Sequence, residues 1–281
     1  MRHWINLLRY LTVRSDRKEY IMTILDEIAQ EARRRVSRAK EINPLSEVME
    51  KALSLPKKNF EFENALRKEG ISFICECKKA SPSKGLIAED FPYTDIAREY
   101  EAAGADCISV LTEPKWFLGK DEYLKEITEM ISIPCLRKDF TVDDYMIYEA
   151  RLLGASAVLL ICSILSPDQL RAYLKICDRL GLSALVEAHD EAEVKMAIDA
   201  GARIIGVNNR NLKDFTVDTE NSRRLRNLIP RDVIFVSESG VKGPEDVAAL
   251  REIGADAVLV GETLMRAADK KSKLEELRGN R

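Results

Sequence analysis

Residues 73–85 read FICECKKASPSKG, an apolar run that ends in charged residues and then in a turn rich in Ser, Pro and Gly. This order predicts a buried β-strand that ends in a polar loop. Because strand side chains alternate between two faces, Glu76 and Lys78 share one face at the carboxyl end of this strand. An ion pair on an exposed strand tip would explain these two residues taken alone, so their meaning depends on the rest of the chain.

A repeating unit follows this strand: a helical pattern, a Gly-Ala turn, a short β-rich run and a polar loop. The turns begin at Gly104, Gly154, Gly201 and Gly254. The predicted strands are Phe73–Cys77, Cys107–Leu111, Pro134–Lys138, Ala157–Cys162, Ala184–Glu187, Ile204–Asn208, Val233–Glu238 and Ala257–Gly261. Their starts are roughly 20 to 35 residues apart, which leaves room for one crossover helix between parallel strands. The pattern predicts an α/β fold, a (β/α)8 TIM barrel; a doubly wound sheet is the alternative, but no GxGxxG follows the first strand.

Two helical patterns precede the first strand. Apolar residues recur every three or four positions from Ile24 to Lys40, and Pro44 opens a second pattern that ends at Pro56. We therefore expect one barrel domain over residues 22–281, with pre-barrel helices at about 22–56. Residues 1–21 are basic and match no barrel unit, so we expect them to be a non-essential extension.

The composition argues against several classes of partner and cofactor. A net charge of −3 gives no case for nucleic acid, and no apolar run approaches the roughly 18 to 20 residues of a membrane-spanning helix. The six cysteines form no C-x-x-C pair, which is typical of free thiols in a reducing cytoplasm. With two histidines in the chain, a transition-metal site is not expected. Lys, Glu, Asn and Ser therefore have to supply the chemistry, on a small molecule in the cytoplasm.

The active site of a TIM barrel lies at the carboxyl ends of its strands. Here these ends carry Glu76, Lys78, Thr112, Glu113, Arg137, Lys138, Cys162, Ser163, Glu187, 208–210, 238–240 and 261–263. Lysines and glutamates from several strands should therefore converge on one mouth. The glycine-bearing ends at 237–240 and 261–263 follow the last two strands, where barrels bind phosphate through backbone N–H groups. A phosphorylated sugar is the expected class of substrate.

Six motifs occur in a fixed order: ECKKASPSKG (76–85), LRKDF (136–140), LVEAH (185–189), GVNNRNL (206–212), SESG (237–240) and VGETLM (260–265). Together they resemble the indole-3-glycerol-phosphate synthase family of tryptophan biosynthesis, over about residues 22–266. The resemblance implies a carboxy-lyase, a decarboxylase of aromatic amino-acid biosynthesis. It would convert 1-(2-carboxyphenylamino)-1-deoxyribulose 5-phosphate to indole-3-glycerol phosphate, carbon dioxide and water, with no metal or organic cofactor. It also implies that the pre-barrel helices lie across the barrel mouth.

The resemblance also implies residue roles. Lys138 is the general acid that protonates the ribulose carbonyl, and Lys78 holds the substrate carboxylate and assists loss of the hydroxyl. Glu76 and Glu187 keep these amines charged and supply a base, and which of them is the base stays open. The implied substrate-binding residues are Ser81, Phe117, Asn208, Arg210 and Glu238, and the implied phosphate-binding residues are Ser239, Gly240, Gly261 and Glu262. At Glu262 we expect a backbone N–H contact, since a carboxylate that faces phosphate is unfavourable.

The pKa of the acid needs tuning, because a lysine with a pKa of about 10.4 is a poor acid at neutral pH. A second ammonium and burial lower this pKa, whereas nearby carboxylates oppose them.

Three other functions compete with this interpretation. In a Schiff-base aldolase, Lys138 or Lys78 would be the nucleophile. An isomerase of the same pathway acts on a related aminated ribose phosphate but lacks the helices before the barrel. A barrel could also bind a phosphorylated metabolite without catalysis, which the lysines and glutamates at the mouth argue against. We expect a monomer or weak homodimer that acts on a small phosphorylated molecule.

Overall fold

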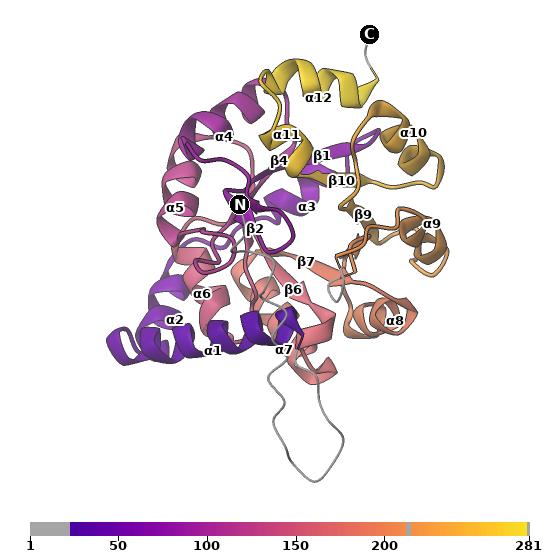
Figure 1. The fold of residues 1–281 in the computed structure, drawn as a ribbon. Coiled ribbons are helices and arrows are strands. Elements are labelled where there is room, and N and C mark those ends of the chain that lie inside the picture. The colour runs from indigo at the N-terminus through magenta and orange to yellow at the C-terminus, as the bar shows by residue number, and fades with distance from the viewer. Residues whose placement is uncertain (1–22, 212–214, 280–281) are drawn as a thin grey trace.

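The computed structural model describes residues 23–211 and 215–279, and within them eight parallel strands close into a barrel (Figure 1). The order around the barrel is β1-β10-β9-β8-β7-β6-β5-β4, so each strand pairs with its neighbour in the chain and the first pairs with the last. The barrel strands are β1 (Ser72–Cys77), β4 (Cys107–Leu111), β5 (Cys135–Lys138), β6 (Ala157–Ile161), β7 (Ser183–Ala188), β8 (Ile204–Asn208), β9 (Ile234–Glu238) and β10 (Ala257–Val260). The predicted TIM barrel and its strands are confirmed.

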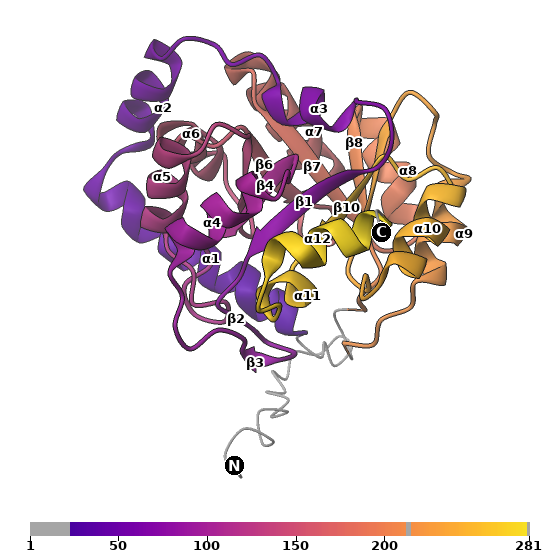
Figure 2. The ribbon, with the colours of Figure 1, turned by 90° about the horizontal axis from the view of Figure 1, so that it is seen from above.

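Helices follow the strands and form a ring around the barrel (Figures 1 and 2). They are α4 (Tyr93–Ala102), α5 (Asp121–Met130), α6 (Tyr145–Leu152), α7 (Pro167–Leu180), α8 (Glu191–Ala200), α9 (Glu220–Arg226), α10 (Pro244–Glu252), α11 (Glu262–Met265) and α12 (Lys270–Arg278), with a 3-10 turn at Cys162–Ile164. The predicted Gly-Ala turns end α4, α6, α8 and α10, and their glycines have φ between 77° and 88°. Glycine is favoured there because this left-handed conformation is strained for residues with a Cβ.

Helix α7 shows how local sequence defines one unit of the ring. Ser166 caps the helix in a capping box with Gln169, and Pro167 occupies the first turn. The apolar residues at helical spacing, such as Leu170 and Cys177, are buried against the barrel. Side chains of this kind from every unit, together with the buried strands, form one hydrophobic core.

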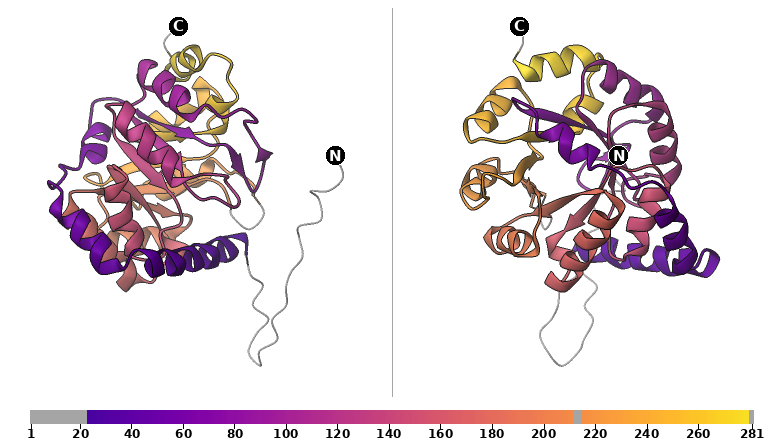
Figure 3. Two further views of the ribbon diagram at one scale, coloured as in Figure 1. Left: turned by 90° about the vertical axis from the view of Figure 1, so that its left-hand side faces the viewer. Right: turned by 180° about the vertical axis from the view of Figure 1, so that it is seen from behind.

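Three helices precede the barrel: α1 (Ile24–Ile42), α2 (Leu45–Ser54) and α3 (Glu61–Leu66). Thr23 and Asp26 form the capping box that begins α1. Figure 3 shows α1 and α2 on the outside of the barrel. The first turn of α1 reaches the mouth, whereas α2 packs beside α6 and α3 lies at the opposite end, where the Glu63 N–H donates to Ser183 Oγ at 3.0 Å. The sequence predicted α1 and α2 but not α3, and residues 1–21 lie outside the described residues.

A hairpin that the sequence did not predict extends from the end of β1. Its strands are β2 (Ala80–Ser81) and β3 (Gly85–Leu86), which pair antiparallel within the polar loop of the ASPSKG motif. Figure 2 shows this hairpin and α3 at opposite ends of the barrel. All six cysteines are buried and free. No helix in the described ranges is long and apolar enough to cross a bilayer.

Candidate active site

The carboxyl ends of the strands surround a cavity of about 470 Å³, a volume typical of small-molecule sites. Its lining brings together every residue to which the family resemblance assigns a role. These are Glu76, Lys78, Ser81, Phe117, Lys138, Glu187, Asn208, Arg210, Glu238, Ser239, Gly240, Gly261 and Glu262. In the ranges 23–211 and 215–279, no group of His, Cys, Asp and Glu side chains is arranged to hold a metal ion.

Lys138, at the end of β5, is the centre of the charged groups. Its Nζ donates a hydrogen bond of 3.0 Å to Glu238 Oε2 and lies 3.7 Å from Glu187 Oε2 and 4.0 Å from Glu76 Oε2. These carboxylates come from β9, β7 and β1, so three different strands direct negative charge at one ammonium. The nearest of them, Glu238, was predicted to bind substrate rather than the lysine.

The carboxylates decide the protonation state of Lys138. Burial lowers the pKa of this amine, but Glu238, Glu187 and then Glu76 outweigh burial and raise the pKa well above its usual range. The sequence had left open whether burial and a second ammonium or the carboxylates would prevail. In this site the carboxylates prevail, and Lys138 is an ammonium throughout the neutral range.

Glu76 and Lys78 form the pair expected from their shared strand face. Lys78 Nζ donates to Glu76 Oε1 at 2.5 Å, and Ser109 Oγ donates to the other carboxylate oxygen at 3.4 Å. Burial would raise the pKa of Glu76, but Lys78 and Lys138 outweigh it and lower this pKa. Gly261 lies against the pair: a Cβ there would come within 2.5 Å of Glu76 Oε1 and 2.8 Å of Lys78 Nζ. This glycine, predicted for phosphate binding, thus also provides space for the pair.

Behind Glu187 lies His189, a residue to which the sequence analysis gave no role. Its Nε2 is 3.3 Å from Glu187 Oε1, an ion-pair distance, and its Nδ1 is 3.0 Å from Glu193 Oε2 in the first turn of α8. Burial lowers the pKa of His189, but the two carboxylates outweigh it and raise the pKa to about 10. Burial in turn would raise the pKa of Glu187, and His189 with Lys138 lowers it to about 2. The signal was present in the sequence, since His189 and Glu193 are four residues apart at the start of a helix.

Glu238 has different surroundings. Its Oε1 is buried and accepts no hydrogen bond from any described residue. Gly206 on the neighbouring strand β8 leaves the space for this oxygen, because a Cβ there would lie 2.2 Å from it. Burial raises the pKa of Glu238, Lys138 lowers it, and the negative charges of Glu187 and Glu76 raise it again, to about 7.

The loop after β9 has an unusual backbone. Ser239 has φ of 67° and Gly240 has φ of 102°, so two successive residues are in the left-handed region. Hydrogen bonds hold this turn: Ser239 Oγ donates to Asn208 Oδ1 at 3.0 Å, and Asn209 Nδ2 donates to the Ser239 carbonyl at 3.0 Å. Ser239 and Gly240 both line the cavity, at the position predicted for phosphate.

After the neighbouring strand β10, the Glu262 carboxylate is paired with cations. It lies 3.1 Å from Arg266 Nε and 3.5 Å from Lys84 Nζ on the β2–β3 hairpin. Burial would raise the pKa of Glu262, but the hydrogen bond from Arg266 and the charge of Lys84 lower it. The charge of this side chain is thus balanced by Arg266 and Lys84, and the backbone N–H contact of residue 262 with phosphate stays a prediction. Lys84 and Lys242 line the same end of the cavity and were not predicted, although both lie in or beside the quoted motifs.

The remaining predicted residues border the cavity from the side. Asn208 Oδ1 accepts the backbone N–H of Arg210 at 3.0 Å, and Arg210 Nη1 donates to the Phe215 carbonyl at 3.2 Å. The Phe117 ring lies 5.9 Å from the Phe140 ring, so two aromatic side chains face one apolar part of the cavity. Phe140 was not predicted. The apolar lining also includes Ile24, Leu25 and Ile28 of α1.

Comparisons with known proteins show which sequences this chain is similar to. The family model described as indole-3-glycerol phosphate synthase matches residues 25–277. The protein called indole-3-glycerol phosphate synthase in Ruminiclostridium cellulolyticum is 60% identical over 258 residues, which cover 92% of this chain and 99% of the relative. The protein of the same name in Lachnoclostridium phytofermentans is 50% identical over 268 residues, 91% of this chain and 98% of the relative.

Solved structures agree with the fold alone. A crystal structure of 3-hexulose-6-phosphate synthase has a TM-score of 0.62 and 15% identity, and the match covers 75% of this chain and 99% of that one. A tryptophan synthase structure from Pyrococcus furiosus has a TM-score of 0.56 and 17% identity, and covers 75% and 99% of the two chains. The family model matches most of this chain, and the matches to the two relatives cover nearly the whole of each relative. This chain therefore belongs to the indole-3-glycerol phosphate synthase family.

Proposed function

We propose that the chain carries out the activity of its family, the carboxy-lyase reaction that forms indole-3-glycerol phosphate, with Lys138 as the general acid. The substrate would be 1-(2-carboxyphenylamino)-1-deoxyribulose 5-phosphate. Its ring closes, its carboxylate leaves as carbon dioxide and one hydroxyl leaves as water. The observation that carries the assignment of the acid is the ammonium of Lys138, to which three strands present carboxylates within 4.0 Å.

The first step uses the proton of this ammonium. Lys138 Nζ donates it to the ribulose carbonyl oxygen, so that the carbonyl carbon becomes electrophilic and the aromatic carbon that bears the carboxylate attacks it. A new carbon–carbon bond forms, and loss of carbon dioxide restores the aromatic ring. The raised pKa of Lys138 argues against the aldolase alternative, because a Schiff-base lysine must be neutral to attack a carbonyl. It also makes the resting ammonium a weaker acid than a free lysine, so its role as acid rests on its position in the cavity.

Lys78 serves the carboxylate and the later dehydration. From the end of β1 it would hold the substrate carboxylate at the start of the reaction and protonate the departing hydroxyl at its end. Glu76 keeps it in place through the hydrogen bond of 2.5 Å. A carboxylate of the cluster accepts the proton that is released as the indole ring forms.

The rest of the cavity would bind and orient the substrate. Ser81 and the backbone N–H groups of Ser239, Gly240, Gly261 and Glu262 would contact the phosphate, and Lys84 would add a cation. Asn208 and Arg210 would orient the ribulose hydroxyls. Phe117 and Phe140 would border the anthranilate ring, because both line the apolar part of the cavity.

Two measurements test the proposal. Purified full-length chain mixed with the carboxyphenylamino sugar phosphate should produce indole fluorescence, and its absence under conditions in which the protein is folded would overturn the proposed activity. Borohydride added with substrate should leave the masses of Lys138 and Lys78 unchanged. A covalent sugar adduct on either lysine would favour the aldolase.

We further propose that the chain is a cytoplasmic monomer or weak homodimer that binds neither nucleic acid nor a cofactor, and that residues 1–21 lie outside a barrel domain at 22–281. The net charge of −3 supports the absence of nucleic acid. Sedimentation at assay concentrations should give a monomer or a concentration-dependent dimer. A stable higher oligomer would contradict this.

A further inference from the structure

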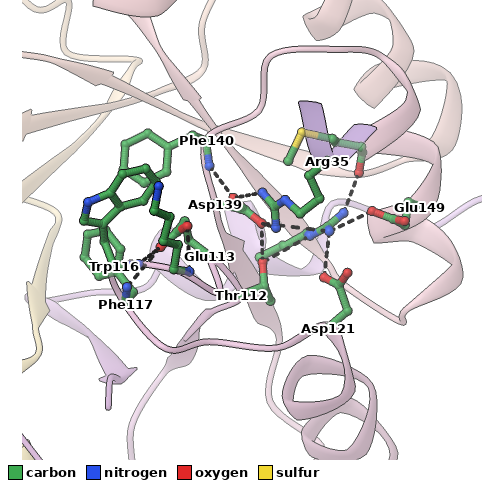
Figure 4. Close-up of polar contacts among 12 residues, drawn as sticks. Arg35, Thr112, Glu113, Trp116, Phe117, Asp121, Asp139, Phe140 and Glu149 are labelled. Carbon is green, nitrogen blue, oxygen red and sulfur yellow. Dashed lines mark hydrogen bonds and ion pairs between the residues drawn. The ribbon is translucent and has the colours of Figure 1, made fainter. Parts of the chain in front are cut away.

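Lys138 lies in the LRKDF motif between two charged residues that the proposed mechanism does not use, Arg137 and Asp139. Both side chains are buried, with 2% and 0% of their surface exposed. Adjacent strand residues point to opposite faces, so Arg137 points away from the cavity that Lys138 faces. Figure 4 shows the polar contacts in this region, with Arg35 and Thr112 beside Asp139.

Asp139 binds the pre-barrel helix α1. Arg35 of α1 donates to both carboxylate oxygens, from Nη2 to Oδ1 at 2.7 Å and from Nη1 to Oδ2 at 3.0 Å. Thr112 Oγ1 donates to Oδ2 at 2.7 Å, and the Phe140 N–H donates to Oδ1 at 2.8 Å. A bidentate guanidinium–carboxylate pair fixes orientation as well as charge. If Arg35 is removed, the fully buried carboxylate keeps hydrogen bonds from neutral donors only.

Arg137 cannot replace Arg35 without breaking other contacts. Its Nη2 donates to Asp121 of α5 and to Glu149 of α6, each at 2.7 Å, and its Nη1 donates to the Met146 carbonyl at 3.0 Å. It lies 4.0 Å from Asp139. A movement of Arg137 toward an unpaired Asp139 would weaken the contacts with α5 and α6. Loss of Arg35 would therefore either leave Asp139 without its bidentate partner or draw Arg137 away from α5 and α6. We expect both outcomes to shift the backbone beside Lys138.

We propose that Arg35 is a positioning residue for the reaction: its bidentate pair with Asp139 fixes the strand end that carries Lys138 and the cavity residue Phe140. The inference rests on the proposed role of Lys138 as the acid. It assigns to α1 a function beyond bordering the mouth, because Arg35, which is 104 residues from its partner Asp139 in the sequence, sets the place of the proton donor Lys138.

The test compares three variants of the full-length chain. Arg35→Met removes the pair, Arg35→Lys keeps the charge without the bidentate geometry, and Lys40→Met is the matched control. Lys40 is on the same helix and pairs with Asp143 at 2.7 Å, where both side chains are about one-third exposed. Each variant is measured for kcat, KM and the Kd of indole-3-glycerol phosphate, and circular dichroism checks folding.

Arg35→Met should lower kcat about 10- to 100-fold, the cost of a misplacement near 1 Å or less, while the Kd of the product changes by no more than a few-fold. Lys40→Met should match the parent, and Arg35→Lys should recover part of the lost kcat. Equal kcat values for folded Arg35→Met and Lys40→Met would overturn the inference. If Arg35→Met does not fold, Arg35→Lys decides, and a parental kcat in that variant overturns the inference.

Lys138→Met, assayed in parallel, separates this inference from the proposed function. If Lys138→Met keeps parental turnover, the assignment of the acid is wrong and the positioning role is wrong with it. If Lys138→Met is inactive and Arg35→Met is normal, the acid stands and only the role of Arg35 is refuted.

Discussion

The ends of β7 and β9 present two carboxylates to the same ammonium, yet their surroundings differ. Glu187 lies 3.7 Å from Lys138 Nζ and has a second cation, His189, at 3.3 Å from its other oxygen. Glu238 is closer to Lys138, at 3.0 Å, but its second oxygen faces the space left by Gly206 and accepts no hydrogen bond from the described residues. The number of partners, rather than the distance to Lys138, separates the two.

The difference appears in their pKa values. His189 and Lys138 lower the pKa of Glu187 to about 2, whereas burial and neighbouring carboxylates raise that of Glu238 to about 7. Two carboxylates whose environments separate their pKa values in this way usually have different roles. Glu187 is then a permanent anion that holds Lys138, and Glu238 is the carboxylate that can gain and lose a proton near neutral pH.

Removing the shared cation should have the largest effect. Lys138→Met is expected to lower turnover roughly 10²- to 10⁴-fold, the usual range for a positioned acid, because no other group replaces its proton. Steady-state kinetics measure the loss, and the Kd of indole-3-glycerol phosphate is the control, which should stay nearly constant since the proposed phosphate contacts lie on other strands. Near-parental turnover from neutral to alkaline pH would show that Lys138 is only a structural cation.

The two carboxylates themselves should differ in the shape of the pH profile. Glu187→Gln is expected to lower turnover at every pH from 5 to 9, because this carboxylate stays ionised throughout that range. In the parent, activity should rise as pH increases through about 7, where Glu238 loses its proton and can accept the bond from Lys138. Glu238→Gln should lose this inflection and cost one charge-assisted hydrogen bond, about 1.5–3 kcal/mol, or roughly 10- to 100-fold.

The comparison would be wrong if the inflection near neutral pH disappears in Glu187→Gln and persists in Glu238→Gln. That result would assign the titrating proton to the β7 carboxylate Glu187, one of the two residues, with Glu76, that the family resemblance implies as bases.

Replacing His189, the second cation beside Glu187, should make the environment of Glu187 resemble that of Glu238. In His189→Asn the pKa of Glu187 should rise, and turnover should fall a few-fold at pH 8 and further at pH 6. Since the pKa of His189 is raised from 6.5 to about 10, its stabilising effect is fully present below pH 6.5 and is lost as pH rises through about 10. The difference in Tm between the parent and His189→Asn should therefore be largest near pH 6 and should decrease to nearly zero as the pH approaches 10.

Glu193→Gln is the control for that substitution. It removes the partner on α8 but leaves His189 beside Glu187, so the pH profile of turnover should move less than in His189→Asn. A Tm difference between parent and His189→Asn that is constant with pH would refute the ion pair with Glu187.

Sequence patterns predicted the parts of this site that follow from the regular geometry of strands and helices. Parallel strands in a barrel bring their carboxyl ends to one mouth, so Glu76, Lys138 and Glu187 could be placed together without coordinates. The turn glycines marked where each helix ends. The same reasoning could not find α3, because its N-cap residue Phe60 is in a left-handed conformation and its side chain makes no capping hydrogen bond.

The features that the sequence did not predict depend on contacts that leave no periodic pattern in the sequence. Arg35 and Asp139 are 104 residues apart, and nothing in either segment indicates the other. The two-residue strands of the β2–β3 hairpin are too short to show alternation. The pKa values of the cluster required the distances, since the signs of burial and of neighbouring charges oppose each other at Lys138.

Deleting residues 1–21 should have the smallest effect, with kcat and KM within a few-fold of the parent. The truncated chain keeps every neighbour described for Glu187 and Glu238, and it keeps Thr23, whose capping box with Asp26 begins α1. A soluble, folded truncation without turnover would contradict the proposed domain boundary. Extending the deletion through Pro56 removes Ile24, Leu25 and Ile28 from the cavity, and Arg35 with them. Because those residues border the site and hold the β5 end, the longer deletion should raise KM sharply and lower kcat, and unchanged kinetics would refute both roles of α1.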